Sequence, residues 1–187
     1  MRVQAIALIA VTATSLAACG DKKTDTTPSA AATKPAPSAS ISPSTSGSDS
    51  TVSSADGIKV STDLSKKPTI TKPTGPAPTT LVTRDIVVGK GQGATVGDEL
   101  VAHYLGAHYT TGKQFQASWD TGRPFAFTLG QGGVIPGWVK GLEGMKIGGR
   151  RLLIIPPALA YGDGGQGDIK PGETLIFVVD LLNDTPA

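Results

Sequence analysis

Few residues in this sequence could carry out polar chemistry. It holds two histidines, His103 and His108, and one cysteine, Cys19, so these residue types alone cannot assemble a metal site. It has no Walker sequence, no G-x-S-x-G and no paired-cysteine spacing. His103 falls in a strand pattern and is predicted to be structural. His108 is predicted to lie exposed in a bulge before a hairpin.

One glycine-rich segment matches a dinucleotide-binding pattern by its letters. Residues 162–167 read G-x-G-x-x-G. Such a site requires the glycines to lie between a strand and a long helix. Pro171 and Gly172 follow closely, so no such helix can begin there, and we predict a loop. Nucleic-acid binding is not expected either, because the formal net charge is +2 and no dense run of Lys or Arg occurs.

The aromatic side chains are a more informative set. They make up 5% of the chain and none occurs before Tyr104, so the packed core must lie in the C-terminal half. They recur at the edges of predicted elements: Tyr104, Phe115, Trp119, Phe125, Phe127, Trp138, Tyr161 and Phe177. A small aromatic core accounts for any one of them. Their order along the chain carries more information.

Hydrophobic periodicity predicts the elements that position these residues. Strand patterns cover 81–88, 99–105, 114–118, 125–129, 151–155 and 175–182, and the last two are nearly continuous apolar runs, typical of well-covered central strands. Residues 135–143 fit a short helix, because Pro136 suits a first turn and Trp138 and Leu142 would share a face. The predicted fold class is α+β, an antiparallel half-barrel sheet wrapped on one short helix.

Seven short motifs follow one another from Leu81 to Leu182. They are Val101-Ala-His-Tyr104, Gly112-Lys-Gln-Phe115, Pro124-Phe-Ala-Phe-Thr-Leu-Gly130, Val134-Ile-Pro-Gly-Trp138, Gly148-Gly-Arg150, Ala160-Tyr-Gly162 and Thr174-Leu-Ile-Phe177. In this order and at these gaps, the stretch resembles an FKBP-type peptidyl-prolyl isomerase domain. The resemblance implies an FKBP-like fold and cis-trans isomerisation of X-Pro bonds in unfolded or exported proteins. It implies no metal and no cofactor.

The resemblance also assigns a substrate pocket. Trp138 would form its floor, with walls from Tyr104, Phe115, Phe125, Val134, Ile135 and Phe177. The backbone N–H of Ile135 and the hydroxyl of Tyr161 would bind peptide carbonyls. Gln116, Gln166 and Ile169 would border the bound chain, the last two from the loop over the pocket.

The polar rim departs from the family pattern. Gln116 stands where the family usually has Asp, Ala117 replaces a common Ser, and Thr121 stands where some members carry Arg. Gln116 could keep a hydrogen bond to Tyr104 or Tyr161 and preserve the pocket, and we expect retained but reduced isomerase activity. Alternatively, the domain acts as a proline-peptide binder or holdase. A third class is a purely structural surface lipoprotein.

The N-terminus is typical of an export signal. Residues 1–18 carry Arg2 and then an apolar stretch too short to span a membrane. The segment Leu16-Ala-Ala-Cys19 resembles a bacterial lipobox, which implies cleavage before Cys19 and a lipid on its sulfur. The alternative is an ordinary secretory signal with a leftover cysteine. With the anchor, the protein is predicted on the extracytoplasmic face of the cell membrane.

Composition divides the rest of the chain. Residues 19–57 are rich in Ser, Thr, Pro and Ala, so they are predicted to form a disordered tether. Residues 58–80 combine weak strand character with four prolines and are predicted to form an arm wrapped on the domain edge. Residues 81–187 would form the isomerase domain, and a monomer is expected.

Overall fold

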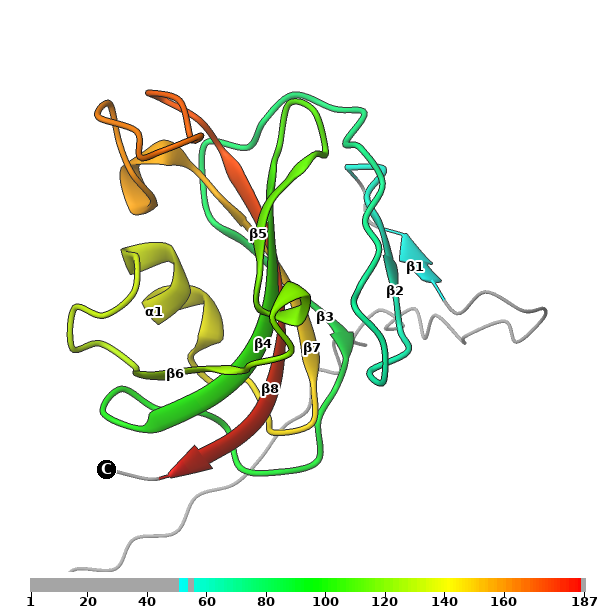
Figure 1. The fold of residues 1–187 in the computed structure, drawn as a ribbon, viewed down its shortest axis with the longest axis vertical. Helices are drawn as coiled ribbons and strands as arrows, with labels where there is room; N and C mark the ends of the chain where they lie inside the picture. The colour runs from blue at the N-terminus through cyan, green and yellow to red at the C-terminus, as the bar shows by residue number, and fades with distance from the viewer. Residues whose placement is uncertain (1–50, 54–55, 186–187) are drawn as a thin grey trace, which may run out of the picture. The chain divides into compact units, whose positions relative to one another are not determined.

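An antiparallel sheet curves around one short helix (Figure 1). The computed structural model describes residues 51–53 and 56–185. The sheet contains β3 (Val82–Val87), β4 (Glu99–His108), β5 (Gln114–Ala117), β6 (Phe125–Thr128), β7 (Arg150–Ile155) and β8 (Leu175–Thr185). Its order is β3-β7-β8-β4-β5, with β6 also paired to β4. The helix is α1 (Pro136–Leu142), and two 3₁₀ turns, η1 (Ser118–Asp120) and η2 (Pro157–Leu159), complete the elements. The predicted antiparallel sheet with a single short helix is confirmed.

Strand β4 extends beyond its predicted end. It pairs with β8 as far as His108, which lies opposite Leu175, while its other side pairs first with β6 and then with β5. The prediction that His108 lies exposed in a bulge is therefore wrong. The alternation of apolar side chains stops after Leu105, but the backbone ladder continues because β8 offers a partner along its whole length.

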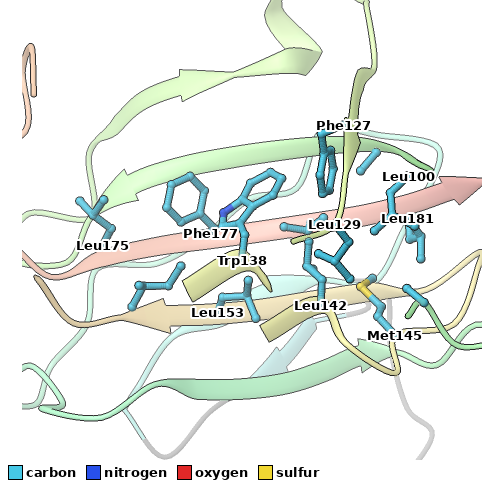
Figure 2. Close-up of a cluster of buried hydrophobic side chains, with 14 of the residues drawn as sticks. Leu100, Phe127, Leu129, Trp138, Leu142, Met145, Leu153, Leu175, Phe177 and Leu181 are labelled. Carbon is cyan, nitrogen blue, oxygen red and sulfur yellow. The ribbon is translucent and has the colours of Figure 1, made fainter. Parts of the chain in front are cut away.

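Helix α1 packs closely against the sheet because two of its residues lack side chains. A Cβ on Gly137 would lie 2.3 Å from a side-chain carbon of Ile155, and one on Gly141 would lie 2.8 Å from Leu153. Trp138 and Leu142 project from the same helical face and are buried (Figure 2). A helix of seven residues is marginal alone, so this packing stabilises it.

The two central strands bury both of their faces. Along β8, Leu175, Phe177, Val179 and Leu181 join the core cluster beneath α1, as several of them do in Figure 2. Ile176 and Val178 point the other way, into a second cluster. The sequence prediction that 151–155 and 175–182 are well-covered central strands is confirmed.

The second cluster is closed by the arm that precedes the sheet. The arm carries β1 (Thr51–Ser53), paired with β2 (Lys59–Ser61), and Figure 1 shows these strands on the opposite side of the sheet from α1. Ile58 and Val60 are each 0% exposed. Burying two such side chains contributes about 1.5–3 kcal/mol each. The arm therefore covers a face of the sheet, whereas the sequence placed it at the edge.

Strand β1 also corrects the predicted boundary of the tether. Composition predicts that residues 51–53 belong to a disordered segment, yet they pair with β2 in the register Thr51 opposite Ser61. Backbone hydrogen bonds need no apolar side chain, so composition could not reveal this pairing. The signal peptide, Cys19 and the tether up to residue 50 lie outside the described residues, where their predictions stay untested. No helix within the described part of the chain is long and apolar enough to cross a membrane.

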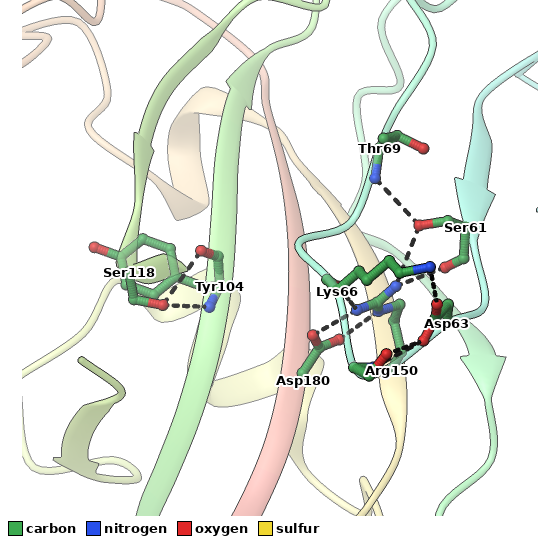
Figure 3. A network of polar contacts seen from close by, with 9 residues as sticks. Ser61, Asp63, Lys66, Thr69, Tyr104, Ser118, Arg150 and Asp180 are labelled. Carbon is green, nitrogen blue, oxygen red and sulfur yellow. Dashed lines mark hydrogen bonds and ion pairs between the residues drawn. The ribbon is translucent and has the colours of Figure 1, made fainter. Parts of the chain in front are cut away.

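One buried arginine joins the arm to the sheet (Figure 3). The side chain of Arg150 is 0% exposed and forms two hydrogen bonds to the Asp180 carboxylate, at 2.5 and 2.7 Å. It also donates to the backbone carbonyls of Ser61, at 2.7 Å, and Lys66, at 3.0 Å. Burial raises the pKa of the Asp180 carboxyl, and the Arg150 hydrogen bonds oppose that rise. Arg150 therefore links β7, β8 and the arm.

Replacing Arg150 by methionine should lower the free energy of unfolding by about 3–5 kcal/mol, because Asp180 would stay buried without its partner. The measurement is chemical denaturation monitored by tryptophan fluorescence. Lys66→Met is the matched control, since the Lys66 side chain is 78% exposed and pairs only with Asp63, a contact worth about 0–1 kcal/mol. Equal stabilities for the two variants would contradict this role for Arg150.

Candidate functional site

A pocket of about 220 Å³ opens where the core beneath α1 reaches the surface. Its wall residues come from four strands, the start of the helix and two loops. They are Tyr104, Gln116, Phe125, Gly133, Val134, Ile135, Trp138, Tyr161 and Phe177. Eight of these nine were assigned to the site from the sequence, and Gly133 is the addition.

The Trp138 indole lies at the centre of the aromatic lining. Its ring centroid is 5.4 Å from those of Tyr104 and Phe177, with interplanar angles of 80° and 87°. Phe127 lies behind it at 5.4 Å, and Phe125 lies 6.3 Å away at the pocket wall. Edge-to-face contacts of this kind add to the burial energy and hold rings in fixed orientations. The indole therefore presents a preformed apolar surface.

The absence of a side chain at Gly106 makes room for two of the rings. A Cβ there would lie 2.7 Å from a ring carbon of Phe115 and 2.9 Å from one of Phe177. These two rings meet edge to face at 5.8 Å. Gly106 lies two residues after Tyr104 in β4, and only the structure shows which rings occupy the space that it leaves.

The pocket rim carries two polar groups without protein partners. Ile135 is the residue before α1, and its carbonyl accepts the N–H of Trp138 at 2.9 Å. Within the described residues, the Ile135 N–H has no hydrogen-bond acceptor, and the Tyr161 hydroxyl has no partner. Both groups are free to bind a ligand in the pocket.

A second hollow of about 280 Å³ adjoins the pocket and shares Gln116 and Tyr161 with it. The remaining predicted site residues, Phe115, Gln166 and Ile169, line this hollow. Gly167 and Asp168 complete its lining. Ile169 is buried and forms an isolated bridge with Gln166, so it fastens the loop as well as lining the hollow. The loop contains turns and this bridge but no helix, which confirms that its G-x-G-x-x-G letters do not precede a helix.

The pocket is electrically neutral. No Asp, Glu, Lys, Arg or His is among its lining residues. Burial raises the pKa of Tyr104, and the nearby Tyr161 adds to the rise, so the Tyr104 phenol stays protonated at neutral pH. Within the described residues, no group of three or more His, Cys, Asp or Glu could hold a metal ion. The arrangement can desolvate and orient a neutral apolar group, but it holds no acid or base.

The two histidines lie outside the pocket and support neighbouring elements. His103 stacks on Trp119 at 4.3 Å, and its Nδ1 lies 2.9 Å from the Ser118 hydroxyl. His108 lies 3.0 Å from the Glu173 carboxylate, with only 14% of its side chain exposed, and contacts the Phe115 ring. These contacts agree with a structural role for His103 and give His108 one as well.

Comparison with known proteins decides the family. Residues 90–182 match the family model described as FKBP-type peptidyl-prolyl cis-trans isomerase. The chain is 51% identical over 119 residues to the FK506-binding protein of Streptomyces anulatus, covering 63% of this chain and 96% of that protein. The chain belongs to the FKBP-type peptidyl-prolyl cis-trans isomerase family.

Two further relatives support the FKBP assignment. The probable FK506-binding protein of Corynebacterium glutamicum is 48% identical over 118 residues, which cover 63% of this chain and 98% of that protein. The crystal structure of AtFKBP13 aligns with a TM-score of 0.54 at 38% identity, covering 58% of this chain and 96% of that one. Sequence and fold therefore agree on an FKBP domain.

The departure from the usual FKBP residue at Gln116 has a structural consequence. Gln116 is exposed on β5 and lines both hollows. Its side chain makes no hydrogen bond to Tyr104, Tyr161 or any other described residue. The predicted option that Gln116 holds the pocket shape through such a bond is therefore not seen. The aromatic contacts around Trp138 hold the shape instead.

Ser118 is a supporting residue that the sequence did not reveal. Its hydroxyl accepts the backbone N–H of Tyr104 at 2.9 Å and contacts His103, as Figure 3 shows in part. It lies in η1, the turn between β5 and β6. Since β4 pairs with neither strand at Tyr104, the hydroxyl satisfies a backbone group that the ladder leaves open.

We expect Ser118→Ala to lower the free energy of unfolding by about 1–3 kcal/mol, because the Tyr104 N–H would lose its acceptor in a partly buried site. Urea denaturation measures the loss. Ser65→Ala is the control, since the Ser65 hydroxyl bonds only to the exposed Asp63. A Ser118→Ala protein as stable as this control would show that water or the His103 ring replaces the hydroxyl.

Proposed function

We propose that this chain accelerates cis-trans isomerisation of X-Pro bonds in exported proteins, with the proline ring seated on Trp138. The observation that carries the proposal is a neutral aromatic pocket with an unpaired N–H, that of Ile135, at its rim. A pocket of about 220 Å³ is large enough for the proline ring and part of the residue before it.

The apolar lining lowers the barrier through desolvation. Rotation about a peptide bond must break amide resonance, at a cost of about 18–20 kcal/mol. The planar amide has a larger dipole than the twisted one and is better solvated by water. A site that offers no charge and little water favours the twisted amide relative to the planar one, and only such differential binding raises the rate. This requires no nucleophile and no ionised group.

Two donors would hold the chain on either side of the rotating bond. The Ile135 N–H sits at the start of α1, and the Tyr161 hydroxyl lies across the same pocket. If each binds one carbonyl of the peptide, rotation is confined to a single bond. The Ile135 donor is held by the start of α1, and Tyr161 lies in the turn that follows η2, packed against the core beneath α1, so neither would need large reorganisation during the step.

The location is proposed from the N-terminal sequence. A signal peptide over 1–18 and a lipid on Cys19 would leave the domain tethered outside the cytoplasmic membrane. The 31 residues between Cys19 and β1 would span roughly 28–33 Å as a coil. The domain would then reach newly exported chains near the membrane surface.

We expect turnover of an X-Pro tetrapeptide in a protease-coupled or NMR exchange assay. Tyr161→Phe should lower kcat/KM roughly threefold to tenfold, the effect of one neutral hydrogen bond, in a protein that remains folded. Gln116→Asp, which restores the usual family residue, should raise it. Gln92→Asp adds the same charge at an exposed loop residue that lines neither the pocket nor the adjoining hollow, and it should leave the rate unchanged.

The same assay separates the competing functions. If micromolar protein binds the peptide but gives no isomerisation rate above background, the protein is a proline-peptide binder or holdase and not an isomerase. If the protein neither binds the peptide nor turns it over, it is a structural surface protein.

We expect Cys19→Ala to move the protein from the membrane fraction to the medium or the soluble extracytoplasmic fraction, because the residue that carries the lipid is lost. Cell fractionation followed by immunoblotting measures this. If the variant stays membrane-bound to the same degree, the anchor proposal fails, whatever the isomerase assay shows.

A further inference from the structure

Strand β6 has a free edge beside the pocket. Its four residues, Phe125–Thr128, pair with β4 on one side only. Within the described part of the chain, no other strand pairs with β6. Unpaired edges offer rows of backbone N–H and C=O groups to an incoming chain.

The hydrogen-bond pattern shows which groups point outward. The Leu129 N–H donates to the Asp98 carbonyl, and the Leu129 carbonyl accepts the Gly97 N–H, both at 2.9 Å. Hydrogen-bonded and non-hydrogen-bonded positions alternate along an antiparallel pair. Phe127 and Phe125 therefore direct their backbone groups toward β4, and Ala126 and Thr128 direct theirs to the free edge.

A hollow of about 250 Å³ runs along this edge. It is lined by all four β6 residues together with Gln131 and Gly133 of the following loop. Phe125 and Gly133 also line the Trp138 pocket, so the hollow adjoins the pocket. Phe125 is 38% exposed and stacks on the buried Phe127 ring at 5.3 Å, which gives the junction a fixed apolar surface.

We propose that a client chain seated in the pocket continues along β6 as an added strand. The occupant is the extended segment adjoining the X-Pro bond, because the hollow adjoins the pocket that would hold the proline. A four-residue edge spans roughly 13 Å, enough for about four client residues. Backbone bonds to Ala126 and Thr128 would recognise the extended chain without regard to its side chains.

This inference deepens the proposed isomerase function and rests on it. It makes the enzyme selective for unfolded segments over prolines held in tight turns, because a turn cannot supply an extended flanking strand. The preference is therefore for conformation rather than for a particular sequence.

The test compares the mature chain on an X-Pro tetrapeptide with peptides extended by four residues on either side. We expect extension on one side to raise kcat/KM about fivefold to tenfold, and extension on the other to have little effect. N-methylation of alternate residues in the effective extension should abolish the gain in a period-two pattern, because only every second amide faces β6. No gain on either side, or a gain indifferent to N-methylation, would overturn the proposal.

A matched pair of variants locates the effect. Thr128→Pro removes one outward N–H but no bond to β4, and proline is tolerated at strand edges. Thr128→Val keeps that N–H in a side chain of nearly the same shape. The readout is the ratio of long- to short-peptide kcat/KM, which should fall toward one in Thr128→Pro and stay high in Thr128→Val. The ratio corrects for any change in the amount of folded protein. Equal ratios in the two variants would overturn the proposal.

Failure of the isomerase proposal is distinguishable from failure of this one. If no peptide is turned over, the same peptides and variants are compared by fluorescence anisotropy, and the long-to-short affinity ratio decides the question. If the edge instead pairs with a second copy of the chain, sedimentation will show a dimer that Thr128→Pro disrupts, and the client-strand proposal is overturned.

Discussion

Strands β7 and β8 are apolar on both faces, and each face must be covered by something other than water. Helix α1 covers one face through Trp138 and Leu142. The arm covers the other through Ile58 and Val60, and this second layer makes an apparently peripheral segment part of the folded unit. Arg150 fixes the two layers together, because its guanidinium satisfies Asp180 and two arm carbonyls at once.

The pocket follows from how this core ends. Trp138 and Phe177 are core residues, each 4% exposed, while Tyr104, Ile135 and Tyr161 pack against the core from its partly buried rim. Gly106 and Gly133 add no side chains at this end. The result is a region of core-like composition that remains open to a ligand. An apolar ring can enter it without displacing any protein group.

A neutral site of this kind acts through solvation and orientation rather than through proton transfer. Loss of the usual carboxylate at Gln116 therefore changes the rim and leaves the aromatic contacts around Trp138 intact. The free edge of β6 likewise offers no charged side chain for recognition, which would depend on backbone groups alone. Both features suit clients that share an extended backbone and a proline but no common sequence.

The sequence by itself predicted the six strands of the main sheet and the helix to within a few residues, and its family motifs indicated eight of the nine residues that line the pocket. Strands can be predicted from alternating or continuous apolar runs. The pocket residues lie in short motifs that can be recognised without knowing how the rest of the chain folds. It also predicted that 151–155 and 175–182 are covered on both sides. It could not show which segment covers each face, because the covering segments are distant in the chain. The arm contributes only Ile58, Val60 and the partly buried Ile70 to the second cluster.

Only the tertiary structure shows four features: the pairing of β1, the burial of His108 against Glu173, the hydrogen bond from the Tyr104 N–H to the Ser118 hydroxyl, and the free edge of β6. The first three depend on a backbone group or a polar side chain meeting a partner elsewhere in the chain, and the fourth on a backbone edge that no described strand pairs with. Residue type sets which side chains leave water, but it does not set which hydrogen-bonding partners they find there. For this protein, therefore, the sequence predicts which side chains are apolar and buried, whereas the tertiary structure determines the polar contacts that join its layers.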